Sequence, residues 1–186
     1  MKYTELQSVL IRTGMLSADL LDRVIADTSG TTTTWLEHLV KHRLVAEEAI
    51  ASCAGRAAFV PLCDLDRLEL VPNEVIAQVP WDLAIEHRLV PLYSEADQDL
   101  RVAMVDPCNE WANLELEFFL GRRLLREVAP VRAMAWALHK YYNAETSLWP
   151  ARTTHSQPAV ARPGTARMKA IRQPSLSNPM QPILVG

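Results

Sequence analysis

The first 58 residues contain a repeat of apolar positions that becomes visible when the sequence is shifted by 29 residues along itself. Within each copy, spacings of four and five residues are typical of one helix face, and a later apolar pair lies across a short turn in a second helix. The matching positions are Leu6, Leu10, Ile11, Met15, Leu16, Leu21 and Ile25 in the first copy and Trp35, Leu39, Val40, Leu44, Val45, Ile50 and Ala54 in the second. The repeat predicts two helix–turn–helix hairpins, which we expect to pack together because neither can bury its apolar stripe alone.

The turn in each predicted hairpin has its own residue chemistry. Gly14 stands where the first copy needs a permissive backbone at the end of a helix, and its counterpart in the second copy is Arg43. The second hairpin must therefore bend without glycine. Ser17 is a good N-cap for the next helix in the first copy, and Ala46 is a weaker one in the second.

The second part of the chain alternates between predicted helices and strands. The stretch Arg88–Pro107 holds two apolar runs on either side of a polar turn, which predicts two strands. Pro61 disfavours helix in Phe59–Leu65, so this segment is expected to be extended. Further predicted elements are short helices at about 73–78 and 81–87, a helix over Glu110–Leu120, a strand over Leu124–Ala129 and a helix after Pro130. The order helix–strand–strand–helix–strand–helix predicts an α+β fold.

The predicted helix Glu110–Leu120 carries a conspicuous apolar stripe. Trp111, Leu114, Phe118 and Phe119 share one side of it, and we expect that side to face the core. The tryptophans in general fall on predicted core faces, with one left as a candidate anchor for a partner.

The composition divides the chain into three parts. We predict a helical hairpin subdomain (1–58), a small α/β subdomain packed with it (59–146) and a disordered tail (147–186) that holds six of the twelve prolines. Residues 1–146 carry a net charge of −8, whereas the tail carries +5 and no acidic residue. The acidic body argues against nucleic-acid binding, and the basic tail could instead contact an acidic surface. Its final apolar cluster, Ile183, Leu184 and Val185, is a candidate partner contact.

Several kinds of chemistry have no pattern to support them. The six glycines never fall within one loop, so no phosphate-binding loop or dinucleotide fingerprint occurs. The three cysteines show no C-x-x-C spacing, and His38 and His42 lack the glutamate of a zinc-protease motif, so we expect no metal, no cofactor and no catalytic site. No apolar run approaches the about 20 residues of a membrane span, and we expect a cytoplasmic protein. Asp106-Pro107 ends the second predicted strand, where Asp106 is either the cap of the following helix or, with Pro107, a partner contact.

These segments together resemble a known family, the N-terminal domain of type II secretion and type IV pilus assembly ATPases (the GspE N-terminal, or MshEN, domain). The resemblance rests on three stretches within about residues 4–143: "P-x-x-L-A-x-x-x-x-x-x-P-L" from Pro80, "L-x-V-A-M-x-D-P" from Leu100, and Glu117-Phe-Phe-Leu-Gly. It implies a bacterial interaction or regulatory domain. The sequence has no Walker A motif, so we do not expect this chain to be the ATPase.

The resemblance also implies a possible cyclic di-GMP site in the two hairpins. The family motif begins Arg-Leu-Gly, has a second glycine further on and ends in Gln. The corresponding residues here are Glu5, Leu6, Gln7, Gly14 and Thr28 in the first copy and Thr34, Leu36, Arg43 and Ala57 in the second. A carboxylate at the position of an anion-binding guanidinium repels phosphate, and side chains at close-approach glycine positions obstruct backbone contact. We therefore expect the apolar skeleton to remain without binding of cyclic di-GMP in the family mode.

Two hypotheses of different classes follow. The first is a non-enzymatic interaction module that binds a protein partner, near a secretion, pilus or signalling assembly. The alternative is a degenerate cyclic di-GMP sensor that uses a weaker or different binding pose.

Overall fold

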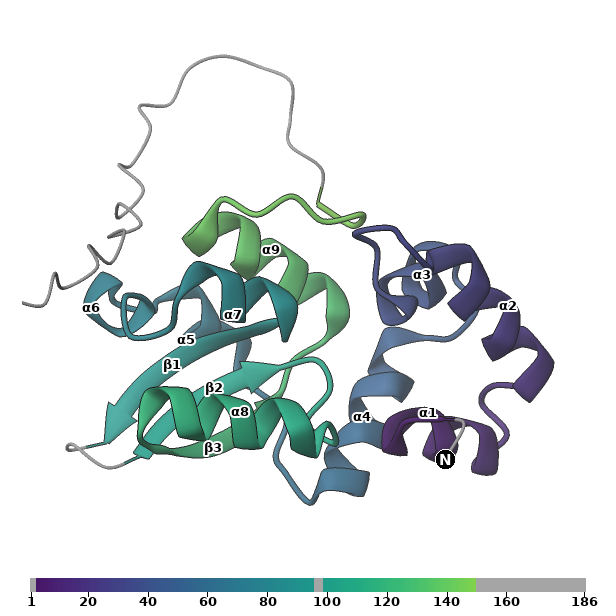
Figure 1. The fold of residues 1–186 in the computed structure, drawn as a ribbon, viewed down its shortest axis with the longest axis horizontal. Coiled ribbons are helices and arrows are strands. Elements are labelled where there is room, and N and C mark those ends of the chain that lie inside the picture. The colour runs from purple at the N-terminus through teal and green to yellow at the C-terminus, as the bar shows by residue number, and fades with distance from the viewer. Residues whose placement is uncertain (1–2, 96–98, 150–186) are drawn as a thin grey trace, which may run out of the picture. The chain divides into compact units, whose positions relative to one another are not determined.

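The repeat forms two helical hairpins, as predicted. The computed structural model describes residues 3–95 and 99–149. The hairpins comprise α1 (Glu5–Arg12), α2 (Ala18–Thr28), α3 (Trp35–Lys41) and α4 (Glu47–Ala58) (Figure 1). Thr4, Ser17 and Thr34 cap three of these helices, each accepting a hydrogen bond from a backbone N–H of the first turn. Because α1 packs against α4 and α2 against α3, each hairpin covers the apolar stripe of the other.

Both hairpins end their first helix with the same geometry. The N–H of Met15 donates to Leu10 O at 3.1 Å, and the N–H of Leu44 donates to Leu39 O at 2.9 Å, as in a Schellman motif. The residue before each donor is left-handed: Gly14 at φ 73° and Arg43 at φ 54°. The second copy therefore does bend without glycine, at the cost of placing an arginine in a conformation that L side chains disfavour.

The α/β part follows the predicted order of elements. It comprises α5 (Leu65–Glu69), α6 (Asn73–Ile76), α7 (Trp81–Glu86), β1 (Leu89–Glu95), β2 (Asp99–Met104), α8 (Glu110–Leu120), β3 (Arg123–Val128) and α9 (Val131–Tyr142). The sheet has the order β1-β2-β3, with β1 antiparallel to β2 and β2 parallel to β3. Met104 in β2 pairs with Leu89 of β1 on one side and with Val128 of β3 on the other. The α+β prediction is confirmed.

The segment before the sheet is partly extended and partly helical. The extended prediction was wrong at Phe59, which is the left-handed C-cap of α4 at φ 55°. It holds at Leu62, which forms an isolated bridge with Val128, and at Cys63, whose N–H donates to Val128 O at 2.7 Å. The prediction was wrong at Leu65, where α5 begins after Asp64 caps it by accepting from the N–H of Asp66. Asp64 lies two residues after the bridge at Leu62, and its cap allows a helix to begin there although Pro61 disfavours helix nearby.

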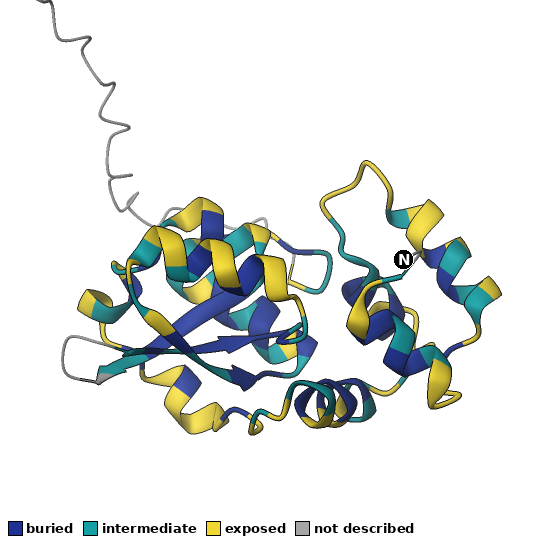
Figure 2. Cartoon of the chain, turned by 60° about the horizontal axis from the view of Figure 1, so that its bottom comes forward, coloured by how far each residue is buried: buried dark blue, intermediate teal, exposed yellow. Residues whose placement is uncertain are grey.

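The core is built on the strands and on one side of the helices. Figure 2 shows much of the strands in dark blue, with teal toward their ends, whereas the helices beside them carry yellow outer sides. The largest fully buried side chains include Leu89, Leu92, Leu100 and Met104 from the strands and Leu6, Leu10, Leu21, Leu39 and Ile50 from the hairpins. One continuous core therefore spans the hairpins and the sheet.

The second hairpin is tied to the start of β1 by a buried ion pair. Glu37 in α3, whose side chain is 3 % exposed, accepts a hydrogen bond of 2.9 Å from Arg88 Nε. The same guanidinium donates to Thr32 O at 3.0 Å and to the carbonyl of Ile85, and the Ser147 hydroxyl donates to the second Glu37 oxygen at 3.0 Å. These bonds join the hairpins, the end of α7 and the segment after α9.

The helix α8 forms at the predicted residues but faces the other way. We expected Trp111, Leu114, Phe118 and Phe119 to be buried, yet they are 85, 62, 91 and 61 % exposed. The buried side consists of Ala112, Asn113 and Leu116. The reason lies at the helix start, where Asn109 caps α8 and the Asn113 amide donates to Pro107 O at 3.2 Å, which holds the smaller residues against the sheet.

The predicted tail lies outside the described residues from 150 onward, and with it Ile183, Leu184 and Val185. Within residues 3–95 and 99–149, no helix is long and apolar enough to cross a membrane.

The paired turns allow a stability prediction. Gly14→Ala should lower the free energy of unfolding by about 1 kcal/mol because a Cβ is disfavoured at positive φ. No atom lies within 4 Å of the added Cβ, so the cost is one of backbone conformation alone. Arg43→Gly should raise the same free energy by about 0.5–1 kcal/mol. Urea unfolding measures both, and a loss of stability in Arg43→Gly comparable to that in Gly14→Ala would contradict the explanation.

Candidate functional site

The motif positions of the first hairpin are engaged in local structure. Glu5 is exposed at the start of α1, and Leu6 is fully buried. Gln7 is 6 % exposed and forms a capping box, since its Oε1 accepts from the N–H of Thr4 at 2.9 Å while its own N–H donates to the Thr4 hydroxyl. The Thr28 hydroxyl donates to Val24 O at 2.8 Å within its own helix. These side chains stabilise helix ends.

The motif positions of the second hairpin also serve as capping, core and turn residues. Thr34 caps α3 by accepting from the N–H of Glu37 at 3.2 Å, and Leu36 is buried. Arg43 is exposed in its left-handed turn, and Ala57 is half-buried near the end of α4. The apolar skeleton of the repeat is therefore kept, with capping and turn residues at the polar positions.

A cavity of about 140 Å³ brings two of these positions together with Asp106. Its walls come from the start of α3 (34–37), the end of α7 (86–88), the β2–α8 connection and α9. Thr34, Leu36 and Asp106 all line it, although they are far apart in the sequence. The volume lies below the about 300–1,000 Å³ of ordinary small-molecule sites, so the cavity is too small to enclose a cyclic dinucleotide.

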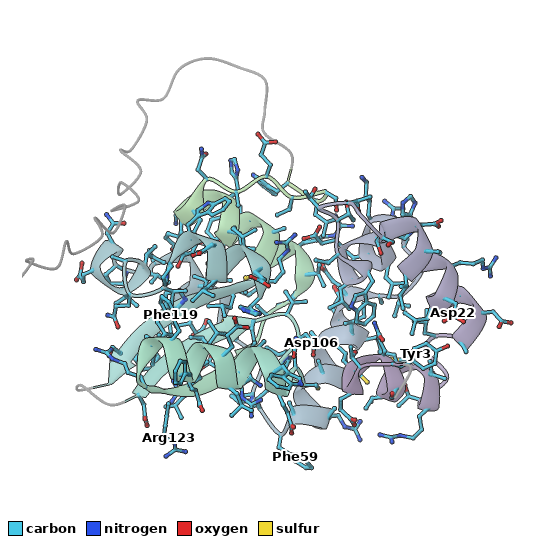
Figure 3. The ribbon with its side chains drawn as sticks, in the orientation of Figure 1. Tyr3, Asp22, Phe59, Asp106, Phe119 and Arg123 are labelled. Carbon is cyan, nitrogen blue, oxygen red and sulfur yellow. The ribbon has the colours of Figure 1, made fainter. Side chains whose placement is uncertain are left out.

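Asp106 is a largely buried carboxylate at this cavity. Figure 3 shows it in the middle of the molecule, beside the beginning of α8. Its Oδ1 accepts from the N–H of Cys108 at 3.1 Å. Burial raises the pKa of Asp106 to about 6, and the hydrogen bond from Cys108 lowers that pKa by a smaller amount. The expectation that Asp106 caps the following helix was wrong, because Asn109 caps α8 by accepting from the N–H of Ala112. An aspartate three residues upstream cannot reach the first free N–H groups of that helix.

Pro107, the other predicted partner contact in this connection, is buried. Its carbonyl accepts from Arg126 at 2.6 Å as well as from Asn113. The segment around Asp106-Pro107 is therefore held from both α8 and β3.

Within residues 3–95 and 99–149, the histidine and cysteine side chains show no arrangement suited to metal binding. The rings of His38 and His42 lie 4.3 Å apart, and among the described residues no three His, Cys, Asp or Glu side chains form a group that could hold a metal ion. Burial raises the pKa of both Cys63 and Cys108 to about 12, so these thiols stay protonated and weakly nucleophilic at neutral pH.

The most unusual surface feature is the outer side of α8. We define the α8 apolar face as Trp111, Leu114, Phe118 and Phe119. The first three follow one another at helical spacings of three and four residues, and Phe119 adjoins Phe118. Figure 3 shows Phe119 near the far end of this helix. Exposed apolar side chains scattered singly are common, but several large ones on one helix face are typical of an interaction site. The sequence contained the stripe, but its periodicity gave no means of assigning it to the surface.

Comparisons with known proteins agree on one family. Residues 60–148 match the family model described as the MshEN domain. The chain is 28 % identical over 137 residues to the type IV pilus assembly ATPase PilB of Myxococcus xanthus (strain DK1622). That match covers 74 % of this chain and 24 % of PilB, so this chain spans about a quarter of the length of that relative.

Two solved structures share the fold. The N-terminal domain of XpsE superposes with a TM-score of 0.54 at 18 % identity, covering 76 % of this chain and 98 % of that one. A structure of MshE with cdg superposes with a TM-score of 0.51 at 21 % identity, covering 74 % of this chain and 98 % of that one. At these identities the likeness establishes the fold alone. Together with the match to the MshEN family model, this shared fold confirms the resemblance predicted from the sequence motifs.

The buried carboxylate generates a pH prediction. Since the pKa of Asp106 rises from 3.8 to about 6 on folding, the unfolded chain releases this proton at lower pH than the folded protein does. The ionised aspartate therefore destabilises the fold increasingly between pH 4 and 6, and by a constant amount above. Asp106→Asn keeps an acceptor for the Cys108 N–H and should be more stable than the wild type at pH 7.5, by on the order of 2 kcal/mol.

The measurement is the free energy of unfolding of both proteins from pH 4 to pH 8. The advantage of Asp106→Asn should grow up to about pH 6 and then level off, whereas the exposed Asp27→Asn should show no such growth. An advantage that stays constant over the whole range would mean that Asp106 is not the titrating group.

Proposed function

Residues 60–148 match the family model of the MshEN domain, and from that premise we propose that this chain is a non-enzymatic interaction module that binds a protein partner through the α8 apolar face. The observation that carries the proposal is the exposure of four large apolar side chains on one helix. Tryptophan is enriched among the residues that dominate binding energy in protein interfaces. A phenylalanine that is 91 % exposed gains nothing from folding, so its position is best explained by a role in binding.

The placement of this face also supports the proposal. The buried side of α8 consists of two smaller residues, Ala112 and Asn113, and one leucine, Leu116. The Asn109 cap and the hydrogen bond from the Asn113 amide to Pro107 O hold the helix in place. In addition, the Glu117 carboxylate accepts from the N–H of Leu124 at 2.9 Å, which ties the last turn to β3. A rigid helix that presents aromatic side chains loses little conformational entropy on binding.

The comparisons support the setting of the proposal. A relative named as a type IV pilus assembly ATPase and a structure of the N-terminal domain of XpsE fit a cytoplasmic role beside a secretion, pilus or signalling assembly.

A second candidate function is a degenerate cyclic di-GMP sensor. It is favoured by the fold shared with the structure of MshE with cdg, where cdg denotes cyclic di-GMP. Against it stand the capping roles of Gln7 and Thr34 and the carboxylate of Glu5 at the arginine position. Those contacts leave the hairpins with a stable scaffold but without a cation at the arginine positions of the family motif, which are Glu5 and Thr34.

Removing the α8 apolar face should abolish partner binding without unfolding the protein. The variant Trp111→Ser/Phe118→Ser changes two highly exposed residues, so its free energy of unfolding should stay within about 1 kcal/mol of the wild type. The variant and the wild type are each immobilised on a support and incubated with an extract of the cells that naturally produce the protein. The captured proteins are then quantified by mass spectrometry. A partner should be lost by at least about tenfold in the variant.

Leu70→Ser is the matched control, because Leu70 is 81 % exposed and lies outside α8. It should capture the partner as the wild type does. If the double variant captures the same proteins in the same amounts as the wild type, the α8 apolar face is not the binding surface.

For cyclic di-GMP we expect no thermal stabilisation of the full-length wild type at micromolar ligand. A ligand that binds the folded state at a hundred times its dissociation constant contributes about 2.7 kcal/mol, which a thermal-shift titration detects easily. The variant Glu5→Arg/Thr28→Gln restores two family residues and serves as the comparison. A shift in the wild type would establish the sensor function instead, and a shift in the variant alone would locate the loss at those two positions.

A further inference from the structure

The α8 apolar face has a carboxylate in its middle. Glu115 is one helical turn from both Trp111 and Phe119 and adjoins Leu114, so it shares their side of the helix. Its side chain is 57 % exposed, and one oxygen lies 3.5 Å from Nε2 of His87, whose side chain is only 9 % exposed. The Glu115 carboxylate therefore contacts the end of α7 and remains partly exposed to solvent within the α8 apolar face.

This carboxylate restricts what can cover the face. A partner that buries the aromatic side chains also removes water from Glu115, and a buried carboxylate without a cation is strongly unfavourable. The occupant must therefore bring a positive charge to the middle of an otherwise apolar contact. Removal of either charge from such a pair leaves the other unpaired, which gives the contact its specificity.

The other charged residues of α8 also favour a positively charged occupant. Every ionisable residue of α8 is acidic, namely Glu110, Glu115 and Glu117. Glu117 is held by the N–H of Leu124, and Glu110 is exposed at the first turn. The helix contains no arginine or lysine that could neutralise the face. The exposed Arg123 follows α8 at its far end, where Figure 3 shows it pointing outward.

A second copy of this chain is a poor occupant. Glu115 lies at the midpoint of the stretch from Trp111 to Phe119, so a two-fold contact between α8 helices would set Glu115 against its own symmetry mate. Two carboxylates at close range inside an apolar contact repel each other. The face is suited to a different, cationic surface.

We propose that the α8 apolar face binds an amphipathic helix of the partner protein that presents a lysine or arginine to Glu115 between its apolar side chains. The inference rests on the proposed function and specifies the partner's chemistry. A helix is the fitting element because the face is a single ridge with spacings of three and four residues, about 12 Å long, which matches the groove between ridges on another helix.

The test uses the full-length protein and two labelled synthetic peptides of about 18 residues, long enough to form a helix on binding. Both carry leucine at positions i, i+3, i+4 and i+7. One has lysine at the flanking and central polar positions, and the other has glutamate there. Fluorescence anisotropy measures the affinity of each peptide for the wild type, for Glu115→Gln, for the exposed control Glu48→Gln and for Trp111→Ser/Phe118→Ser.

The wild type should bind the lysine peptide at least about tenfold more tightly than the glutamate peptide. Glu115→Gln should reduce that ratio at least about threefold, Glu48→Gln should leave it unchanged, and the apolar double variant should lose the lysine peptide. Equal binding of the two peptides overturns the inference. So does an unchanged ratio in Glu115→Gln, because the attraction would then come from the net charge of the body.

The failure of this inference differs from the failure of the proposed function. If the double variant loses the captured partner while peptide charge is without effect, the α8 apolar face binds a partner of other chemistry. If capture is unaffected, the proposed surface itself is wrong. A concentration-dependent dimer in light scattering that the double variant abolishes would assign the face to self-association and overturn the inference.

Discussion

The ion pair between Glu37 and Arg88 is the interaction on which the arrangement of this protein depends. A carboxylate that is almost fully buried is tolerable only when a cation and hydrogen bonds satisfy it, and Arg88 and Ser147 do so. Arg88 adopts a left-handed backbone at φ 49° to reach it and also binds the carbonyl of Thr32. The second hairpin is thereby held against the start of the sheet, and the cavity beside Asp106 lies where they meet.

The hairpin repeat separates fold from ligand chemistry. Its apolar positions form the interior of the hairpins, and that requirement is met by hydrophobic side chains of suitable volume. The polar positions are under no such constraint. Gln7 and Thr34 now stabilise helix termini, and Arg43 occupies a turn at some conformational cost. The scaffold therefore does not depend on which side chains occupy the polar positions of the repeat.

The helix α8 shows the opposite relation, since it has more apolar surface than its fold can use. Ala112 and Leu116 are sufficient to cover the sheet, and the larger side chains remain outside. Glu115 within that exposed face makes non-specific association unfavourable, because every apolar contact made there must also accommodate a carboxylate. In the proposed contact, hydrophobic area would provide the affinity and the charge would limit the choice of partner.

The sequence by itself determined the local structure: the hairpins with their Ser17 cap and Gly14 turn, the paired strands, and the length of α8. These features depend on spacing, capping and turn residues within a few positions of one another. Only the tertiary structure decided which side of α8 meets the sheet, that Asn109 rather than Asp106 caps it, and that Thr34 and Leu36 share a cavity with Asp106. A helix with apolar residues on most sides has two possible inward faces. The choice between them is made by packing volume and by hydrogen bonds to distant segments, which no local pattern records.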